Sequence, residues 1–153
     1  MPRIDTPVRE FLTRAEGQLV GVSDSVAQAA AKLANLKTGC VLVEREGALA
    51  GIFTERDFLV RVVGPGKDPS ALAVGDVMTP DPECVEEWVA VAYAIERMAG
   101  GGYRNIPIVT KENRPVGVLT IFDVIDYLIA LFKDERETDV AESGEEWLDI
   151  GGG

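Results

Sequence analysis

Hydrophobic and polar residues follow one another in short blocks whose spacing changes repeatedly along the first half of the chain. The polar triplet Ser23-Asp24-Ser25 stands before apolar residues at helical spacing, and any of the three could cap that helix. The triplet Gly64-Pro65-Gly66 stops a second helical pattern. The first half therefore predicts a strand at 19–22, a helix at 26–33, a hairpin of strands at 40–43 and 49–53, and a helix at 54–63.

The second half repeats this order, from Val109 onward without a gap relative to Val43. It predicts a strand at 83–85, a helix at 91–98, strands at 106–109 and 116–119, and a helix at 120–132. A unit of three strands and two helices exposes more apolar surface than it can cover alone, so two copies packed against each other would bury it jointly. We expect an α+β fold of two such repeats, at 1–66 and 67–132, followed by a tail at 133–153.

One heptapeptide marks the repeat most clearly, since GIFTERD at 51–57 is matched by GVLTIFD at 117–123. Both copies carry a threonine followed three residues later by an aspartate, which is a capping-box pattern for the start of a helix. Taken alone, each pattern indicates a helix cap more often than a ligand site. A helix start also presents free N–H groups that suit a phosphate, so the two roles are compatible.

Charge and cysteine content narrow the classes of function. The net charge is −11, and the tail holds eight acids against two bases, so nucleic acid and anionic membrane surfaces are unlikely partners. Cys40 and Cys84 lack metal-ligand spacing and the chain has no histidine, so no metal site is expected and both cysteines are expected to be small buried residues. With no signal peptide and no spanning apolar run, we expect a cytoplasmic protein.

The tail is expected to be solvated or disordered. Its apolar cluster of Trp147, Leu148 and Ile150 has two interpretations, a segment docked on its own domain or dimer mate, or a short motif for a partner protein.

Two stretches, GALAGIFTERD at 47–57 and AVAYAIERMAGGGYRNIPIVTKENRPVGVLTIFD at 90–123, carry a family resemblance. Over roughly residues 4–132 the sequence resembles the paired CBS domain. That resemblance implies two βαββα repeats packed sheet to sheet with pseudo-two-fold symmetry. It also implies two clefts for adenosine compounds such as AMP, ADP or ATP, and sometimes S-adenosylmethionine or NAD-type ligands. Family members usually regulate other proteins without chemistry of their own, and often form dimers.

The resemblance assigns roles residue by residue. It implies ribose binding by Asp57 and Asp123, ribose or phosphate binding by Thr54 and Thr120, and adenine slots beside Ile52 and Val118. Each cleft would also use the other copy. The expected contributors are Met78, Thr79, Tyr103 and Arg104 to the Asp57 cleft, and the stretch 4–8 with Lys37 and Thr38 to the Asp123 cleft.

The two clefts are not expected to be equal. Arg56 precedes Asp57, whereas Phe122 precedes Asp123 and cannot neutralise an anion, so the Asp57 cleft is the preferred phosphate site. Solvated surface cations are the plain alternative for Arg56 and Arg104. The main functional hypothesis is a homodimeric sensor of an adenine nucleotide that acts on an unknown partner protein and requires no cofactor. The alternative is a dimerisation or interaction module with vestigial sites. An enzyme is not expected, because no nucleophile–base pair can be named.

Overall fold

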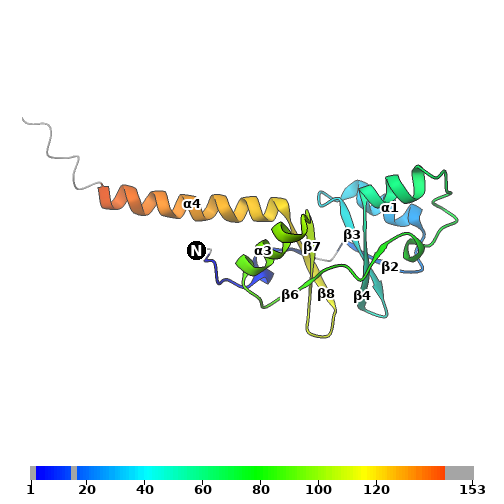
Figure 1. Ribbon diagram of the computed structural model, residues 1–153, viewed down its shortest axis with the longest axis horizontal. Coiled ribbons are helices and arrows are strands. Elements are labelled where there is room, and N and C mark those ends of the chain that lie inside the picture. The colour runs from blue at the N-terminus through cyan, green and yellow to red at the C-terminus, as the bar shows by residue number, and fades with distance from the viewer. Residues whose placement is uncertain (1–2, 15–16, 144–153) are drawn as a thin grey trace, which may run out of the picture.

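The computed structural model describes residues 3–14 and 17–143 (Figure 1). The first repeat contains β2 (Leu19–Gly21), α1 (Val26–Asn35), β3 (Cys40–Arg45), β4 (Ala48–Thr54) and α2 (Glu55–Phe58). The second contains β6 (Val85–Glu86), α3 (Val91–Gly101), β7 (Asn105–Val109), β8 (Pro115–Thr120) and α4 (Ile121–Ser143). The order strand, helix, strand, strand, helix thus occurs twice, which confirms the predicted α+β class.

Local sequence signals explain how the elements begin and turn. Of the three possible caps before α1, Ser25 is the N-cap, and it forms a capping box with Gln28. The β3–β4 hairpin turns at Glu46 and Gly47, which both have positive φ, at 52° and 80°. Two successive left-handed residues match the right-handed twist of the flanking strands, so this turn fixes the hairpin.

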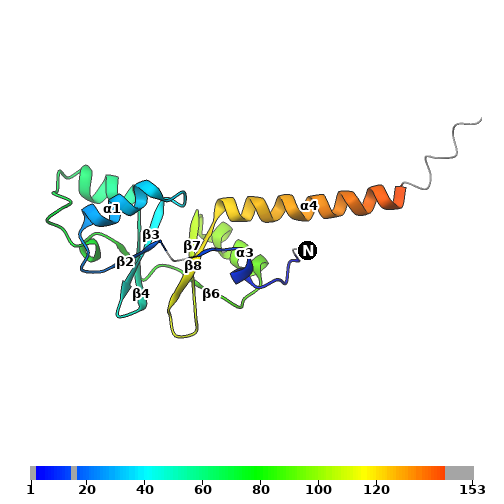
Figure 2. The same ribbon diagram turned by 180° about the vertical axis from the view of Figure 1, so that it is seen from behind.

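Each repeat contributes three strands to a four-stranded sheet, and Figure 2 labels these as β2, β3 and β4 in one sheet and β6, β7 and β8 in the other. The fourth strand of each sheet comes from a segment outside the repeat's own pattern. One sheet has the order β2-β3-β4-β5, in which β5 (Thr79–Pro80) comes from the connector between the repeats, residues 64–84. The other has the order β1-β8-β7-β6, in which β1 (Thr13–Arg14) comes from the N-terminal segment. The connector and the N-terminal segment thus tie the two halves together.

Three apolar clusters hold the fold together. One lies in each repeat, and a third joins the sheets through Cys40, Leu42, Leu49 and Ile52 on one side and Val109 and Val118 on the other. This third cluster confirms that the repeats pack sheet to sheet. The N-terminal 3-10 turn η1 (Val8–Glu10) buries Val8 completely in the cluster of the second repeat.

Two helices differ from the sequence prediction. The helix expected at 54–63 consists of α2 followed by a π-helical segment, η2 (Leu59–Val63). The last helix does not end at Phe132 but continues to Ser143, so that part of the prediction is wrong. The segment after Phe132 contains no Gly or Pro before Gly144, so its acidic composition did not interrupt the helix. The cluster of Trp147, Leu148 and Ile150 lies outside the described residues.

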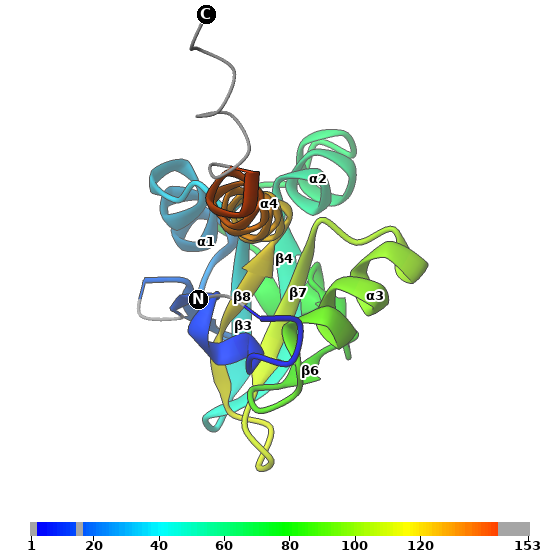
Figure 3. The same cartoon turned by 90° about the vertical axis from the view of Figure 1, so that its left-hand side faces the viewer.

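Helix α4 leaves the body of the fold along the long axis of the molecule, at the end opposite α1 (Figure 1). Seen along that axis, α4 projects between α1 and α2 (Figure 3). Its exposed apolar side chains include Phe122, Ile125, Ile129 and Phe132, spaced three and four residues apart. This spacing lines them up on one face of the helix. Among the described helices, none combines the length and apolarity required to cross a bilayer.

Candidate ligand-binding cleft

The first TxxD pattern forms the helix cap that its spacing predicts. The Thr54 amide donates to Asp57 Oδ2 at 3.0 Å, and the Asp57 amide donates to Thr54 Oγ1 at 3.1 Å. The Glu55 amide donates to the Gly39 carbonyl, which ties the start of α2 to the loop before β3. Asp57 is thereby held in one orientation at the end of β4, with its side chain 13% exposed.

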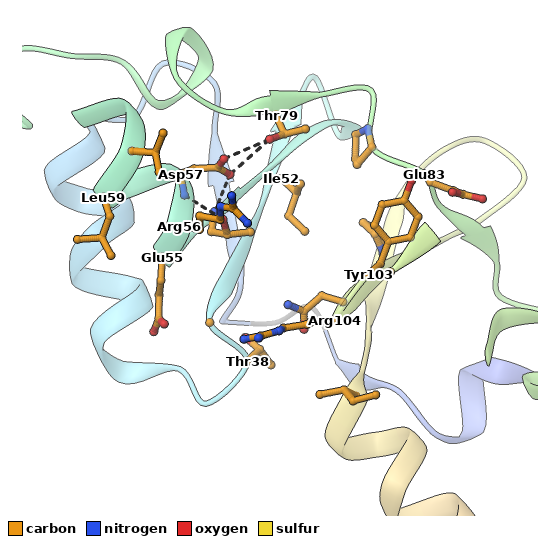
Figure 4. A pocket seen from close by; sticks show the side chains of 18 of the residues that line it. Thr38, Ile52, Glu55, Arg56, Asp57, Leu59, Thr79, Glu83, Tyr103 and Arg104 are labelled. Atoms are coloured by element: carbon orange, nitrogen blue, oxygen red, sulfur yellow. Dashed lines mark hydrogen bonds between the residues drawn. The ribbon is translucent and has the colours of Figure 1, made fainter. Parts of the chain in front are cut away.

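A second hydroxyl reaches the Asp57 carboxylate from the connector. Thr79 Oγ1 lies 3.3 Å and 3.4 Å from the two carboxylate oxygens (Figure 4). The pairing of Thr79 with Ile52 in the β4–β5 ladder sets this approach. Arg61 Nε is 3.8 Å from Asp57 Oδ1, which places a positive charge behind the carboxylate. The Asp57 side chain is therefore a hydrogen-bond acceptor whose position is set by its neighbours.

The second TxxD pattern forms a tighter cap. The Thr120 amide donates to Asp123 Oδ2 at 2.8 Å, and the Thr120 hydroxyl donates to the same oxygen at 2.9 Å. The Asp123 amide donates back to Thr120 Oγ1 at 3.1 Å. Thr120 is buried, with 4% of its surface exposed, so its hydroxyl is engaged within its own repeat.

A cavity of about 1110 Å³ opens beside Asp57, between the two repeats (Figure 4). Residues of both copies line it, so a molecule bound there would contact both. Nine of the thirteen residues expected from the sequence lie on its wall: Lys37, Thr38, Ile52, Thr54, Arg56, Asp57, Thr79, Tyr103 and Arg104.

The other four expected residues lie elsewhere. Met78 belongs to the core cluster of the first repeat, and Val118 is completely buried between the sheets. Thr120 and Asp123 form their own cap and do not line this cavity.

Three expected contributors to the Asp123 cleft also lie in other surroundings. Lys37 and Thr38 lie on the wall of the Asp57 cavity instead, because the loop before β3 faces the loop before β7 across the gap. The stretch at 4–8 runs along the start of α3, where the Val8 amide donates to the Val89 carbonyl.

Three cations surround the cavity. Lys37, Arg56 and Arg104 are exposed, and in the described part of the chain none of them takes part in an ion pair. Figure 4 shows Arg104 extending from the second repeat toward Thr38 of the first. Four acids, Glu55, Asp57, Asp81 and Glu83, also lie on the wall, so the cavity as a whole is not positive. A bound anion would have to lie beside the three cations themselves.

Tyr103 and Glu83 also lie on the cavity wall. Glu83 pairs with Arg97, and its hydrogen bond to Tyr103, together with its charge, raises the pKa of the Tyr103 hydroxyl. A Cβ added at Gly101 would lie 2.0 Å from the Tyr103 ring, so the ring occupies the space that any side chain at 101 would need. Tyr103 thus offers an aromatic face on the cavity wall, with 43% of its surface exposed.

Sequence reasoning missed Glu83 and Arg61. The signal for Arg61 was its position four residues after Asp57, a spacing that pairs opposite charges on a helix. Glu83 sits just before β6, and nothing in its local sequence indicates its bond to Tyr103.

The cysteines behave as small core residues rather than as reactive groups. Cys40 is completely buried, and this burial raises the pKa of its thiol to about 11. Cys84 is partly buried and its pKa is also raised, first by burial and then by Glu83 and Glu86. Within the described ranges, no group of three metal-ligating side chains could hold a metal ion.

The family model and the similar proteins indicate the same family for this chain. The family model described as CBS domain matches residues 8–64 and 74–130. The Schizosaccharomyces pombe protein "Meiotically up-regulated gene 70 protein" is 36% identical over 126 residues, which is 82% of this chain but 17% of that protein. A second relative, an Arabidopsis thaliana CBS domain-containing protein, is 28% identical over 116 residues, which is 76% of this chain but 21% of that protein. This chain thus spans about a fifth of these two relatives.

Solved structures show the same fold. CBSX2 from Arabidopsis thaliana in complex with AMP has a TM-score of 0.71 and 23% identity, over 82% of this chain and 98% of that one. The CBS domain pair of MJ0100 in complex with 5′-methylthioadenosine and S-adenosyl-L-methionine has a TM-score of 0.70 and 22% identity, over 80% of this chain and 99% of that one.

Proposed function

We propose a function from the premise that this chain belongs to the CBS-domain family: it is a regulatory module that binds an adenosine-containing ligand in the Asp57 cavity and passes its occupancy to a partner. One observation carries this proposal. A preorganised carboxylate at a helix start faces cationic and aromatic side chains of the other repeat across a single cavity. No step of the proposal requires catalysis or a cofactor.

The chemistry of the wall fits the parts of a nucleoside. The Asp57 carboxylate can accept hydrogen bonds from both hydroxyls of a ribose. Ile52 and Tyr103 offer apolar and aromatic surface to a flat base. Arg56, Arg104 and Lys37 can neutralise a phosphate. AMP, ADP and ATP are therefore the ligands to test first.

The solved relatives support this ligand class. One CBS pair was crystallised with AMP, and another with 5′-methylthioadenosine and S-adenosyl-L-methionine. These ligands share the adenosine moiety, whereas their charged groups differ. Recognition through the ribose, for which Asp57 is suited, would be shared by all of them.

Transmission requires a surface that a second molecule can contact. Exposed apolar side chains gather on η2 and on α4, at Leu59, Val60, Val63, Ile125 and Ile129 among others. These side chains lie on the same segments that begin at the cavity with Thr54 and Ile121. We propose that this surface forms a homodimer, through which ligand occupancy reaches the regulated protein.

The test is thermal unfolding with AMP, ADP, ATP and S-adenosylmethionine. A ligand at a hundred times its Kd stabilises the protein by about 2.7 kcal/mol. For a chain of this size, that corresponds to a rise in Tm of roughly 5–10 °C. We expect at least one of the four compounds to produce such a rise.

Paired variants locate the site. Asp57→Ala should abolish the ligand-dependent rise, measured against the variant's own Tm without ligand, whereas Asp123→Ala, which removes the same kind of cap, should retain most of it. If none of the four compounds shifts Tm at millimolar concentration, the binding proposal is wrong, and the dimerisation module becomes the better hypothesis. Conversion of a compound to product would contradict a purely regulatory role.

A further inference from the structure

Arg61 contacts three groups next to the cavity: two backbone carbonyls of the connector and the carboxylate of Asp57. Its Nη1 donates to the Val77 carbonyl at 3.0 Å and to the Met78 carbonyl at 2.6 Å. Its Nε lies 3.8 Å from Asp57 Oδ1. A guanidinium has several donors in one rigid plane, so it can hold these groups in a fixed relative position. The side chain is 42% exposed and does not line the cavity itself.

The two carbonyls belong to the connector at the point where it enters the site. Thr79 follows directly, pairs with Ile52 in the sheet, and brings its hydroxyl to the Asp57 carboxylate. Arg61 therefore holds both the carboxylate and the backbone that supplies its hydroxyl neighbour. Loss of the guanidinium would leave Asp57 held by its cap with Thr54, but would release the connector backbone and remove the ion pair on Oδ1 at once.

The second repeat has no equivalent of this arrangement. The residue 66 positions after Arg61, the same offset that relates Asp57 to Asp123, is Tyr127. Tyr127 is buried and packs edge-on against Phe11, with ring centroids 5.0 Å apart. The arginine is thus specific to the repeat whose carboxylate faces the cavity, which a general requirement of the fold would not explain.

We propose that Arg61 is a positioning residue that sets the Asp57 carboxylate and Thr79 for recognition of a ribose diol. The inference rests on the proposed function for the identity of the ligand. The clamp itself, the hydrogen bonds from Arg61 of η2 to the Val77 and Met78 carbonyls of the connector, can be tested without any ligand. Its effect on binding is transmitted through Asp57, so it must depend on the ribose hydroxyls.

The binding test compares Arg61→Gln and Arg61→Lys with the wild type. The control is Arg45→Gln, which changes an exposed arginine at the end of β3, remote from the cavity wall. The probe is whichever of AMP, ADP and ATP gives the largest thermal shift, together with its 2′,3′-dideoxy analogue, in calorimetric titration. Arg61→Gln should raise the Kd of the ribose-containing probe roughly tenfold, the effect expected if a misplaced Asp57 carboxylate loses one hydrogen bond from the ribose.

The dideoxy analogue separates positioning from general damage. Its Kd should differ by less than about twofold between the wild type and Arg61→Gln, because it offers no diol to Asp57. Arg61→Lys keeps the charge but loses the planar fork, so it should recover part of the affinity for the diol. An equal loss for both probes, or no loss for either, would overturn the inference.

The ligand-free test is hydrogen exchange of the connector. We expect the amides of 77–79 to exchange at least about tenfold faster in Arg61→Gln than in the wild type or Arg45→Gln. Unchanged exchange would refute the clamp. If no nucleotide shifts the Tm of the wild type, the proposed function fails, while the exchange result still decides whether Arg61 holds the connector.

Discussion

Gly51 is the position at which the smallest change should disturb both stability and the site. It lies in β4 opposite Pro80 of the connector. A Cβ at this position would lie 2.4 Å from Met78 Sδ and 2.8 Å from the Thr79 carbonyl oxygen. The methionine side chain can move aside, but the carbonyl belongs to the backbone, so β5 must shift. We therefore expect Gly51→Ala to destabilise the fold by about 1–3 kcal/mol, the usual range for overpacking.

The expected fall in Tm is roughly 2–12 °C, because about 1 kcal/mol shifts Tm by about 2–4 °C in a chain of this size. Scanning calorimetry measures it, and urea unfolding gives the free energy independently. The control is Gly100→Ala, since a Cβ at this exposed position of α3 meets no atom within 4 Å. Alanine favours a helix over glycine by about 1 kcal/mol, so this variant should be slightly more stable. A Tm for Gly51→Ala within about 1 °C of the wild type would refute the close approach.

The cysteines and α4 give two further predictions. At pH 8 a thiol reagent should label Cys84 slowly and Cys40 only on unfolding, and labelling of native Cys40 at the rate of a free thiol would contradict its burial. Burial raises the pKa of the Cys40 thiol from 9.0 to about 11. The contribution of this thiol to the free energy of unfolding is therefore complete below pH 9.0 and is lost by about pH 11. Cys40→Ala should not show this loss. On α4, Ile129→Glu should weaken self-association at least about tenfold in light scattering, whereas Asp126→Asn should not. A monomeric wild type would exclude the proposed dimer.

The architecture could be predicted because each repeat is a complete unit with its own periodicity. The offset of 66 residues between Val43 and Val109 was visible because the hairpin and the following helix start have the same length in both copies. The hydroxyl–carboxylate pairs at Thr54 and Thr120 followed from the same spacing, since a capping box is a local structure.

Other features could not be predicted because they depend on contacts between distant segments. A two-residue strand such as β5 has no periodicity of its own, and its place beside β4 depends on Gly51 admitting the connector. Lys37 and Thr38 were expected beside Asp123, but the packing of the two sheets decides which cavity they face. The bonds of Arg61 go to backbone carbonyls, which no residue pattern reports.

The two repeats share a scaffold but differ in how readily each carboxylate could accept a ligand. At Asp123, the Thr120 hydroxyl bonds at 2.9 Å within its own repeat, and a ribose would have to displace this short, buried bond. At Asp57, the competing hydroxyl is Thr79 at 3.3 Å, beyond the usual range for a strong O–H···O bond. Exchange of that hydroxyl for a ribose diol would therefore lose less. Arg56 lies on the wall of the Asp57 cavity, whereas the residue before Asp123 is the neutral Phe122, whose side chain lies on the wall of that same cavity. Bond length and charge therefore both favour Asp57 as the acceptor.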